Sequence, residues 1–164
     1  MFGGGQDYEQ TVVAKDLQNK KDTLIEYIED DGVVVAICGG FQLLGRYYVN
    51  ASGERLNGIS AIDVCTNGQF PNRLIGDVEI FNEEFGETYL GYENHIGRTY
   101  LGKNMKPLGK VVKGFGNNEE DHAEGCHYKN VFCSYFHGPI LVRNQHLADR
   151  IIQTAAQRRH AKNA

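Results

Sequence analysis

Hydrophobic and polar positions in the first part of the chain predict a loop, a helical region and a buried strand. The opening Gly3-Gly4-Gly5-Gln6-Asp7 is typical of a loop, because consecutive glycines allow positive φ and leave the backbone amides unobstructed. Apolar residues then recur at helical spacing up to Ile28, and the helical region is expected to end at Asp31-Gly32. Residues 33–37 are all apolar and mostly β-branched, which indicates a strand buried on both faces of a parallel sheet.

The strand is expected to end in a sharp turn at Cys38-Gly39-Gly40. A helix that packs back on the strand is then predicted from its apolar residues, which are Phe41, Leu43, Leu44, Tyr47 and Tyr48. Strand, turn and helix together form the βα unit of an α/β fold.

The middle of the chain has a different pattern. Between Asn50 and Gly125 it is rich in glycine, asparagine and short alternating runs, such as residues 74–80 and 110–112. Runs of this kind predict β-hairpins and loops.

A second strand and a final helix are predicted near the end of the chain. Residues 130–136 have the composition of a strand, which is followed by His137. An amphipathic helix is expected after it, with Arg158 off the apolar face. The predicted apolar face consists of Leu147, Ala148, Ile151, Ile152 and Ala155.

Composition places the chain in one globular domain. Its 164 residues are 41% hydrophobic and 23% charged, which suits a single packed core. The net charge of −4, without a Lys/Arg stripe, excludes a nucleic-acid surface and favours proteins or small molecules as partners. With neither a signal peptide nor an apolar run of ~20 residues, the chain is expected to be cytoplasmic and not inserted in a membrane. The four cysteines are too irregularly spaced for a disulfide scaffold, so reduced thiols are expected.

Cys38 has the position of a nucleophile. A tight turn between a buried strand and a helix N-terminus exposes the sulfur, and the helix dipole favours the thiolate. The backbone N–H of Gly39 would then point at a developing oxyanion, and an amide from the loop that contains Gly5 could be a second donor. The alternative is that Cys38 is a small buried hydrophobe in a packed turn.

His137 is the predicted acid–base partner of Cys38. The carboxyl ends of parallel strands line one crevice, so residues that follow two such strands can meet there. Taken alone, a histidine before Gly138-Pro139 is more simply a hydrogen-bonded turn residue, and only the pairing with Cys38 favours catalysis.

A zinc site is the rival constellation. His122 and Cys126 are four residues apart, as are Cys133 and His137, which is within the range of zinc ligands. This reading is disfavoured because the first pair has no CxxC-type knuckle, and residues four apart on a strand are too distant for one ion. We therefore expect no metal and no cofactor.

Two motifs resemble those of a known family. Residues 36–45, AICGGFQLLG, resemble the nucleophile elbow of class I glutamine amidotransferases. Residues 135–139, YFHGP, resemble the catalytic-histidine segment of their cobyric-acid-synthase-like branch. Within that branch, the chain is similar to the GatD family, the small subunits of lipid II isoglutaminyl synthases. This closer likeness lies in three segments: GGGQD at 3–7, NRLIGD at 72–77 and YENHIGRT at 92–99.

The resemblance implies a fold, a reaction and a partner. The fold would be a flavodoxin-like α/β amidotransferase domain with β-hairpin insertions. The chain would hydrolyse L-glutamine to glutamate and ammonia, and pass the ammonia to a Mur-ligase-like partner, MurT. That partner would amidate D-glutamate of lipid II in peptidoglycan synthesis. By the same resemblance Cys38 is the nucleophile, His137 the base and Arg73 the glutamine-binding residue, with Arg98 the next candidate.

The chain departs from the family pattern in three places. Ala36 stands where many elbows have glycine, and Pro139 stands where triad enzymes have the glutamate that orients the histidine. The branch generally lacks that acid, so the group that orients His137 is unidentified. The glycine-rich loop begins at the third residue, so residues 1–164 are expected to be a single amidotransferase domain without its first βαβ section.

Two alternatives to the glutaminase of a lipid II isoglutaminyl synthase remain open. The chain could be a non-catalytic, truncated module that binds a synthetase subunit. It could also be the glutaminase of cobyrinic or cobyric acid synthesis.

Overall fold

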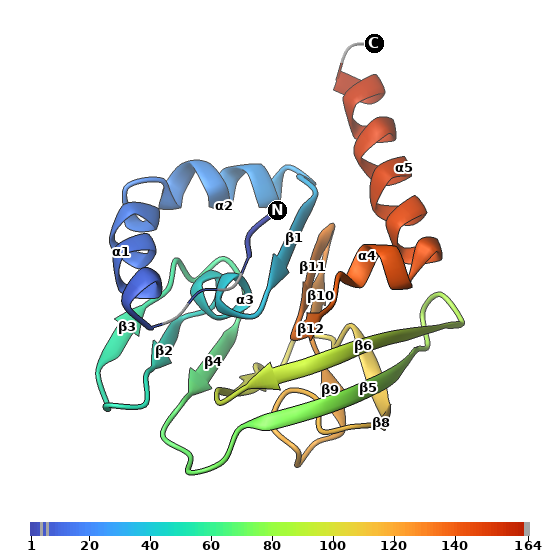
Figure 1. Cartoon of the computed structure of the whole chain (residues 1–164). Coiled ribbons are helices and arrows are strands. Elements are labelled where there is room, and N and C mark those ends of the chain that lie inside the picture. Colours follow the sequence, from blue (N-terminus) through green and yellow to red (C-terminus); the bar gives the residue numbers. More distant parts are fainter. Residues whose placement is uncertain (4, 6, 163–164) are drawn as a thin grey trace.

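The computed structural model describes residues 1–3, 5 and 7–162, so Gly4 and Gln6 of the predicted glycine-rich loop lie outside the described residues (Figure 1). The helices of the described chain are α1 (Asp7–Gln18), α2 (Lys21–Glu29), α3 (Gly39–Leu44), α4 (Ile140–Arg143) and α5 (Gln145–Lys162). Its strands are β1 (Val34–Ile37), β2 (Tyr47–Val49), β3 (Arg55–Asn57), β4 (Val64–Asn67), β5 (Leu74–Asn82), β6 (Glu87–His95), β7 (Arg98–Leu101), β8 (Gly109–Lys113), β9 (Ala123–Glu124), β10 (Cys126–Tyr128), β11 (Val131–Ser134) and β12 (Phe136–His137).

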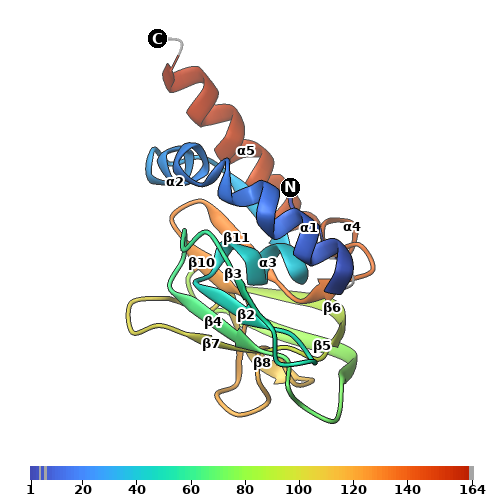
Figure 2. The same cartoon turned by 90° about the vertical axis from the view of Figure 1, so that its left-hand side faces the viewer.

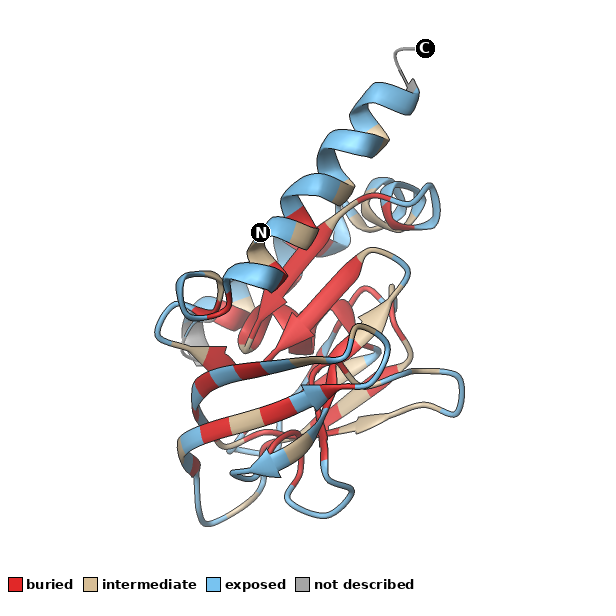
Figure 3. Ribbon diagram, turned by 90° about the vertical axis from the view of Figure 1, so that its right-hand side faces the viewer, coloured by how far each residue is buried: buried red, intermediate tan, exposed pale blue. Residues whose placement is uncertain are grey.

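A small sheet of order β1-β11-β10 is the centre of the fold. Strands β1 and β11 run parallel, with Val34 opposite Val131 and Ile37 opposite Ser134. Every residue of both strands is buried, as the continuous red ribbons in Figure 3 show. The prediction of a strand buried on both faces of a parallel sheet is therefore confirmed.

Helices cover both faces of this sheet, with α1, α2 and α3 on one face and α4 and α5 on the other (Figure 1). The predicted N-terminal helical region is confirmed as helical but consists of two helices, because the chain turns at Asn19 and Lys20. Helix α1 lies against α3 and β3 (Figure 2). The apolar side chains between these helices and β1 form one of two core clusters, and Cys38 packs against both clusters.

The predicted helix after Cys38 is shorter than expected. Helix α3 ends at Leu44, and Tyr47 and Tyr48 lie in strand β2, so their assignment to the helix was wrong. The chain is extended at Gly45, where a Cβ would lie 2.6 Å from a methyl group of Val64. The aromatic and β-branched run after it suits a strand, and β2 pairs with β3 and β4. Strand β7 completes this sheet, of order β3-β2-β4-β7.

The predicted hairpins are confirmed by a long β-hairpin of β5 and β6. These strands pair along nine residues each, from Leu74 opposite His95 to Asn82 opposite Glu87. Burial alternates along both strands, as expected when one face packs on the core and the other meets solvent (Figure 3). The hairpin belongs to a sheet of order β12-β6-β5-β8-β9.

The predicted strand at residues 130–136 is divided between two sheets. Strand β11 ends at Ser134, whereas Phe136 and His137 form β12, which pairs with β6. The buried carboxyl group of Glu124 explains the change of sheet, because it accepts hydrogen bonds from the Tyr135 N–H at 2.7 Å and the Ser134 hydroxyl at 3.1 Å. The Tyr135 N–H is thereby taken out of strand pairing. His137 consequently stands at the junction of the two sheets.

The final helix is present, but its apolar face differs from the prediction. Leu147 and Ile151 are buried, whereas Ile152 is 65% exposed and Ala155 is exposed. Arg158 instead faces the body of the protein, where it stacks over Tyr27 and donates to Asp30. Helix α5 projects beyond the core, and its buried apolar residues, Leu147 and Ile151, lie in its first two turns (Figures 1 and 3). No helix in the described ranges is long and apolar enough to cross a membrane.

The contact between Gly91 and Phe136 yields a first prediction. A Cβ at Gly91 would lie 2.3 Å from the Phe136 ring, so Gly91→Ala should push β12 from β6 and reduce the free energy of unfolding by about 1–3 kcal/mol. Urea denaturation measures this quantity. Gly3→Ala is the control, because among the described residues no atom beyond the chain neighbours of Gly3 lies within 4 Å of the added methyl group. Equal stability of the two variants would contradict the prediction.

Candidate active site

Cys38 occupies a strained turn between β1 and α3. Its φ is 52°, a value uncommon for a residue with a side chain, and its N–H donates to the Ser134 carbonyl at 2.9 Å. Such a conformation costs on the order of 1–3 kcal/mol and persists only where the surrounding structure imposes it. Here the buried strand β1 and the wholly buried helix α3 impose it, and they hold the thiol at the wall of a cavity.

Two glycines allow other backbone segments to approach this turn. A Cβ on Gly39 would lie 2.6 Å from the Gln10 amide nitrogen and 3.3 Å from the Gly5 backbone nitrogen. A Cβ on Gly40 would lie 2.8 Å from the Phe2 carbonyl oxygen. The structure thus brings Gly5 next to Gly39, the two residues that the sequence analysis names as possible oxyanion donors.

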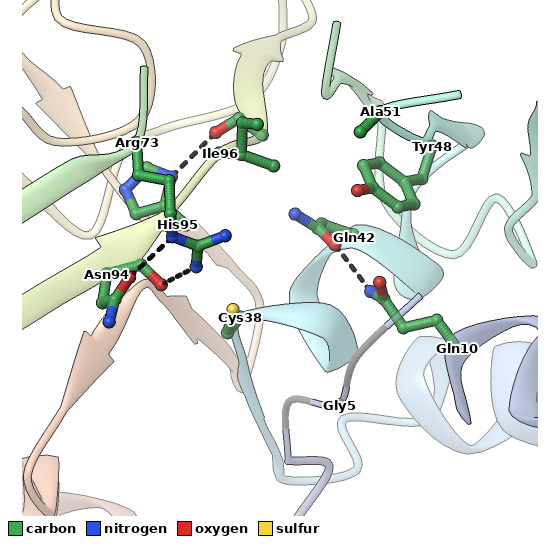
Figure 4. A pocket seen from close by; sticks show the side chains of 11 residues that line it. Gly5, Gln10, Cys38, Gln42, Tyr48, Ala51, Arg73, Asn94, His95 and Ile96 are labelled. Carbon is green, nitrogen blue, oxygen red and sulfur yellow. Dashed lines mark hydrogen bonds between the residues drawn. The ribbon is translucent and has the colours of Figure 1, made fainter. Parts of the chain in front are cut away.

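A cavity of about 600 Å³ opens beside Cys38 (Figure 4). Its described lining residues are Gly5, Gln10, Cys38, Gln42, Tyr48, Ala51, Arg73, Asn94, His95, Ile96 and Gly97. Of these, Arg73 is the one residue with a permanent charge, and three are neutral amides. The site therefore suits a small polar molecule that carries an anionic group.

Arg73 lies on the β6 side of the cavity, and Gln10 and Gln42 lie on the opposite side (Figure 4). The Nε of Arg73 donates to the Asn94 side-chain oxygen at 2.9 Å, and one terminal nitrogen donates to the Asn94 carbonyl at 3.1 Å. The positive charge of Arg73 lowers the pKa values of both Cys38 and His137. The charge of Arg73 therefore acts on both Cys38 and His137, the other two residues to which the family resemblance assigns a role.

The Cys38 thiol is held in its protonated form. Burial raises its pKa above the usual value, and a hydrogen bond from the Gly39 backbone and the charge of Arg73 offset only part of this effect. Attack by Cys38 consequently requires a base that removes the thiol proton.

His137 is half-buried at the end of β12, next to Tyr92 on β6, and is not one of the cavity-lining residues. Burial lowers its pKa, and His95 and Arg73 lower it further. The imidazole is therefore neutral at pH 7 and able to accept a proton. Its ring makes no hydrogen bond to another described side chain that would orient it.

A buried polar chain, which sequence reasoning missed, joins the elements that carry Cys38 and His137. Gln42 follows Cys38 on α3, accepts a hydrogen bond from Gln10 at 2.7 Å and donates to the Tyr135 hydroxyl at 3.1 Å. That hydroxyl also bonds to Thr99 at 2.6 Å, and Tyr135 is two residues before His137. Because Gln42 and Tyr135 are 93 residues apart, no local sequence signal could have connected them.

The ring of His95 packs behind this chain. It stacks on Tyr135 with ring centroids 3.6 Å apart, and its Nδ1 lies 2.8 Å from the Gly97 carbonyl. The buried carboxylate of Glu93, 3.7 Å from the His95 Nε2, accepts the backbone N–H groups of Phe115 and Gly116. These contacts fix the wall of the cavity next to β6.

The residues of the proposed zinc site are separated. Cys126 and Cys133 face each other across β10 and β11, and burial raises the pKa of both thiols. His137, however, belongs to a different sheet. Within the described ranges there is no group of three or more potential metal ligands.

Arg98, the second candidate for binding the substrate, has a structural position. It is buried and donates to the Asn72 and Ile96 carbonyls and to Glu119, and its guanidinium lies over the Phe70 ring. It does not line the cavity, whereas Arg73 does.

Comparison with known proteins defines the class. A solved structure of a glutamine amidotransferase superposes with a TM-score of 0.65 over 94% of this chain and 77% of that chain, at 18% sequence identity, so the chain has the fold of a glutamine amidotransferase. The chain belongs to the CobB/CobQ-like glutamine amidotransferase domain family, whose model matches residues 1–145. The expected α/β class and the likeness to the cobyric-acid-synthase-like branch are thereby confirmed.

Two curated relatives are similar along nearly the whole chain, and both are named lipid II isoglutaminyl synthase (glutamine-hydrolyzing) subunit GatD. The protein of Streptococcus pneumoniae is 58% identical over 162 residues, which are 99% of this chain and 62% of that protein. The protein of Staphylococcus aureus is 44% identical over 158 residues, which are 96% of this chain and 63% of that protein. The chain thus spans somewhat less than two thirds of the length of these relatives.

The electrostatic contact between Arg73 and Cys38 yields a second prediction. Removing a positive charge destabilises the thiolate, so Arg73→Ala should raise the Cys38 pKa and move the pH profile of alkylation to higher pH. The rate of iodoacetamide labelling of the Cys38 peptide, followed by mass spectrometry from pH 6 to pH 10, measures the shift. The Cys65 peptide is the internal control, and a parallel shift there would contradict the assignment.

Proposed function

We propose that this chain is the glutaminase part of a lipid II isoglutaminyl synthase. It hydrolyses L-glutamine to glutamate and ammonia through a thioester on Cys38, and a MurT-like synthetase subunit uses the ammonia to amidate D-glutamate of lipid II. The observation that carries the proposal is a strained cysteine at the wall of a 600 Å³ cavity whose lining bears one fixed charge, that of Arg73. The names of the two relatives, glutamine-hydrolyzing subunits of lipid II isoglutaminyl synthase, support the substrate and the existence of a further subunit, and the MurT-like character of that subunit rests on the family resemblance.

Substrate binding in this proposal begins with the α-carboxylate. The planar guanidinium of Arg73 can bind a carboxylate through two parallel hydrogen bonds. The glutamine side chain then extends across the cavity and places its amide carbon at Cys38. Holding the amide in this position supplies much of the rate, because the reaction becomes effectively intramolecular.

Acylation needs one proton transfer in each direction. Neutral His137 takes the thiol proton as the sulfur of Cys38 attacks the amide carbon. The oxygen of the tetrahedral intermediate accepts hydrogen bonds from the backbone N–H groups of Gly39 and Gly5. When the intermediate collapses, His137 returns the proton to the departing nitrogen, and ammonia and a glutamyl thioester result.

Deacylation repeats these steps with water. His137 removes a proton from the attacking water and gives it to the sulfur as the thioester breaks, so glutamate and free thiol are released. These acylation and deacylation steps require no metal or cofactor. The four free cysteines fit a reducing compartment, so we place the reaction in the cytoplasm.

We also propose that residues 1–164 function as a single amidotransferase domain.

Ammonia released to bulk water would be lost to protonation, so a synthetase partner with a closed passage is part of the proposal. Glutaminase activity in cobyrinic or cobyric acid synthesis is the second candidate, because the family includes such proteins. The high identity to GatD subunits over nearly the whole chain favours the peptidoglycan reaction.

Replacement of the nucleophile tests the proposal. Cys38→Ser should abolish ammonia release from glutamine while thermal unfolding stays nearly unchanged, because a hydroxyl is barely ionised where a thiolate is needed. Cys133→Ala is the control, since its thiol is buried away from the cavity and its loss should lower stability only. Ammonia release by Cys38→Ser at the wild-type rate would remove Cys38 from the mechanism, whereas a wild-type protein that releases no ammonia would favour the non-catalytic binding module.

The role of His137 gives a further prediction with a pH dependence. His137→Ala should lower kcat by at least ~10²-fold, the low end for loss of a general acid–base group. In the wild type the base form of His137 is required and burial lowers its pKa from the usual 6.5, so the acid limb of kcat/KM should be centred below pH 6.5. Steady-state kinetics between pH 5 and pH 8 measure both. An acid limb centred above pH 6.5 would contradict the assignment.

A further inference from the structure

Arg73 is an exposed arginine at the cavity wall, and its partners differ from those of four other arginines. Arg46, Arg98, Arg150 and Arg158 each lie within 4.0 Å of a carboxylate. None of the ion pairs among the described residues includes Arg73. Its charge is therefore not neutralised within the described part of the protein, although it stands at a cavity wall beside the proposed nucleophile.

Two neutral oxygens hold Arg73 in place. Both belong to Asn94: the side-chain oxygen accepts from Nε at 2.9 Å and the carbonyl oxygen accepts from a terminal nitrogen at 3.1 Å (Figure 4). A guanidinium has five N–H donors, so these two bonds leave three donors, which include both hydrogens of the other terminal nitrogen. The group is oriented on one edge and available on the other.

The hairpin register places the two residues together. Arg73 directly precedes β5, and Asn94 on β6 is opposite Ile75, one residue into the pairing. Asn94 lies in a paired strand and Arg73 is next to one, so the hydrogen bonds between them position the guanidinium before a ligand arrives. Preorganisation of this kind reduces the entropy lost on binding.

The amide of Asn94 has an electrostatic consequence. A carboxylate of the same shape would accept the same hydrogen bond but would neutralise Arg73 and compete with an incoming anion. An amide orients the guanidinium without cancelling its charge. The pair is thus built to bind an anionic group rather than to stabilise the hairpin.

We propose that Asn94 is a positioning residue for substrate binding, which holds the Arg73 guanidinium towards Cys38 and leaves its charge free for the α-carboxylate of the amino-acid substrate. The inference rests on the proposed function, in which Arg73 binds glutamine. Asn94 acts through Arg73 and does not itself touch the reacting atoms.

Three variants of the complete protein, purified with any subunit that accompanies it, test the proposal by steady-state kinetics on glutamine. Asn94→Ala should raise KM about 10-fold with kcat within about 2-fold of wild type, the effect of one lost hydrogen bond to a charged group. Asn94→Asp keeps the shape and the acceptor but adds the neutralising charge, so KM should rise at least as much. Arg73→Ala should raise KM most, because the charge itself is lost.

Thr88→Asp is the matched control for charge. Thr88 is exposed and shares a face of β6 with Asn94, six residues and about 20 Å along the strand. The Thr88→Asp substitution adds the same negative charge outside the cavity, so the KM for glutamine should not change. A purely structural role of Asn94 would have the opposite signature, since the isosteric Asn94→Asp would then behave as wild type.

A double-mutant cycle separates action through Arg73 from direct contact with the substrate. In the Arg73→Ala background, Asn94→Ala should have no further effect on KM. Additive effects would overturn the proposal, as would a wild-type KM in Asn94→Asp. If Arg73→Ala raises KM and the Asn94 variants do not, the positioning role is wrong and the proposed function stands. If the wild-type protein releases no ammonia from glutamine, both fail.

Discussion

The active site depends on one buried contact, the hydrogen bond between Gln42 and Tyr135. Gln42 belongs to the helix that starts at Cys38, and Tyr135 is the residue at which the chain leaves the parallel sheet for the hairpin sheet. The Tyr135 hydroxyl is fully buried and also bonded to Thr99, so the contact is made in a medium where leaving either group unpaired would be costly. This hydrogen bond fixes helix α3, which begins directly after Cys38, relative to strand β12, which carries His137.

A second buried polar group explains why Tyr135 stands at that junction. Glu124 accepts the Tyr135 N–H and the Ser134 hydroxyl, and burial raises its pKa to about 8. With this N–H occupied, β11 cannot continue, and the next two residues pair with β6 instead. The position of His137 therefore follows from a carboxyl group that is itself remote from the cavity.

The cavity combines a strained backbone turn at Cys38 with one permanent charge among its described lining residues, that of Arg73. The turn at Cys38 is held in a costly conformation by buried elements on both sides, and the thiol is protonated because burial raises its pKa. Burial, and to a lesser extent His95 and Arg73, lowers the pKa of His137, so its imidazole is neutral. In the proposed mechanism a proton moves from a protonated thiol to a neutral imidazole, which leaves the net charge of the half-buried site unchanged.

Local sequence determined the parts of this protein whose cause is local. The run of apolar residues before Cys38 predicted a doubly buried strand, the following glycines predicted the turn, and the motifs around Cys38 and His137 indicated the amidotransferase family. Sequence did not determine the end of α3, the division of the strand at Tyr135 or the exposed side of α5, because neighbours distant in sequence decide each of them. The same holds for the pairing of Arg73 with Asn94 and of Gln42 with Tyr135, since hydrogen bonds between residues 21 and 93 positions apart leave no periodic pattern along the chain.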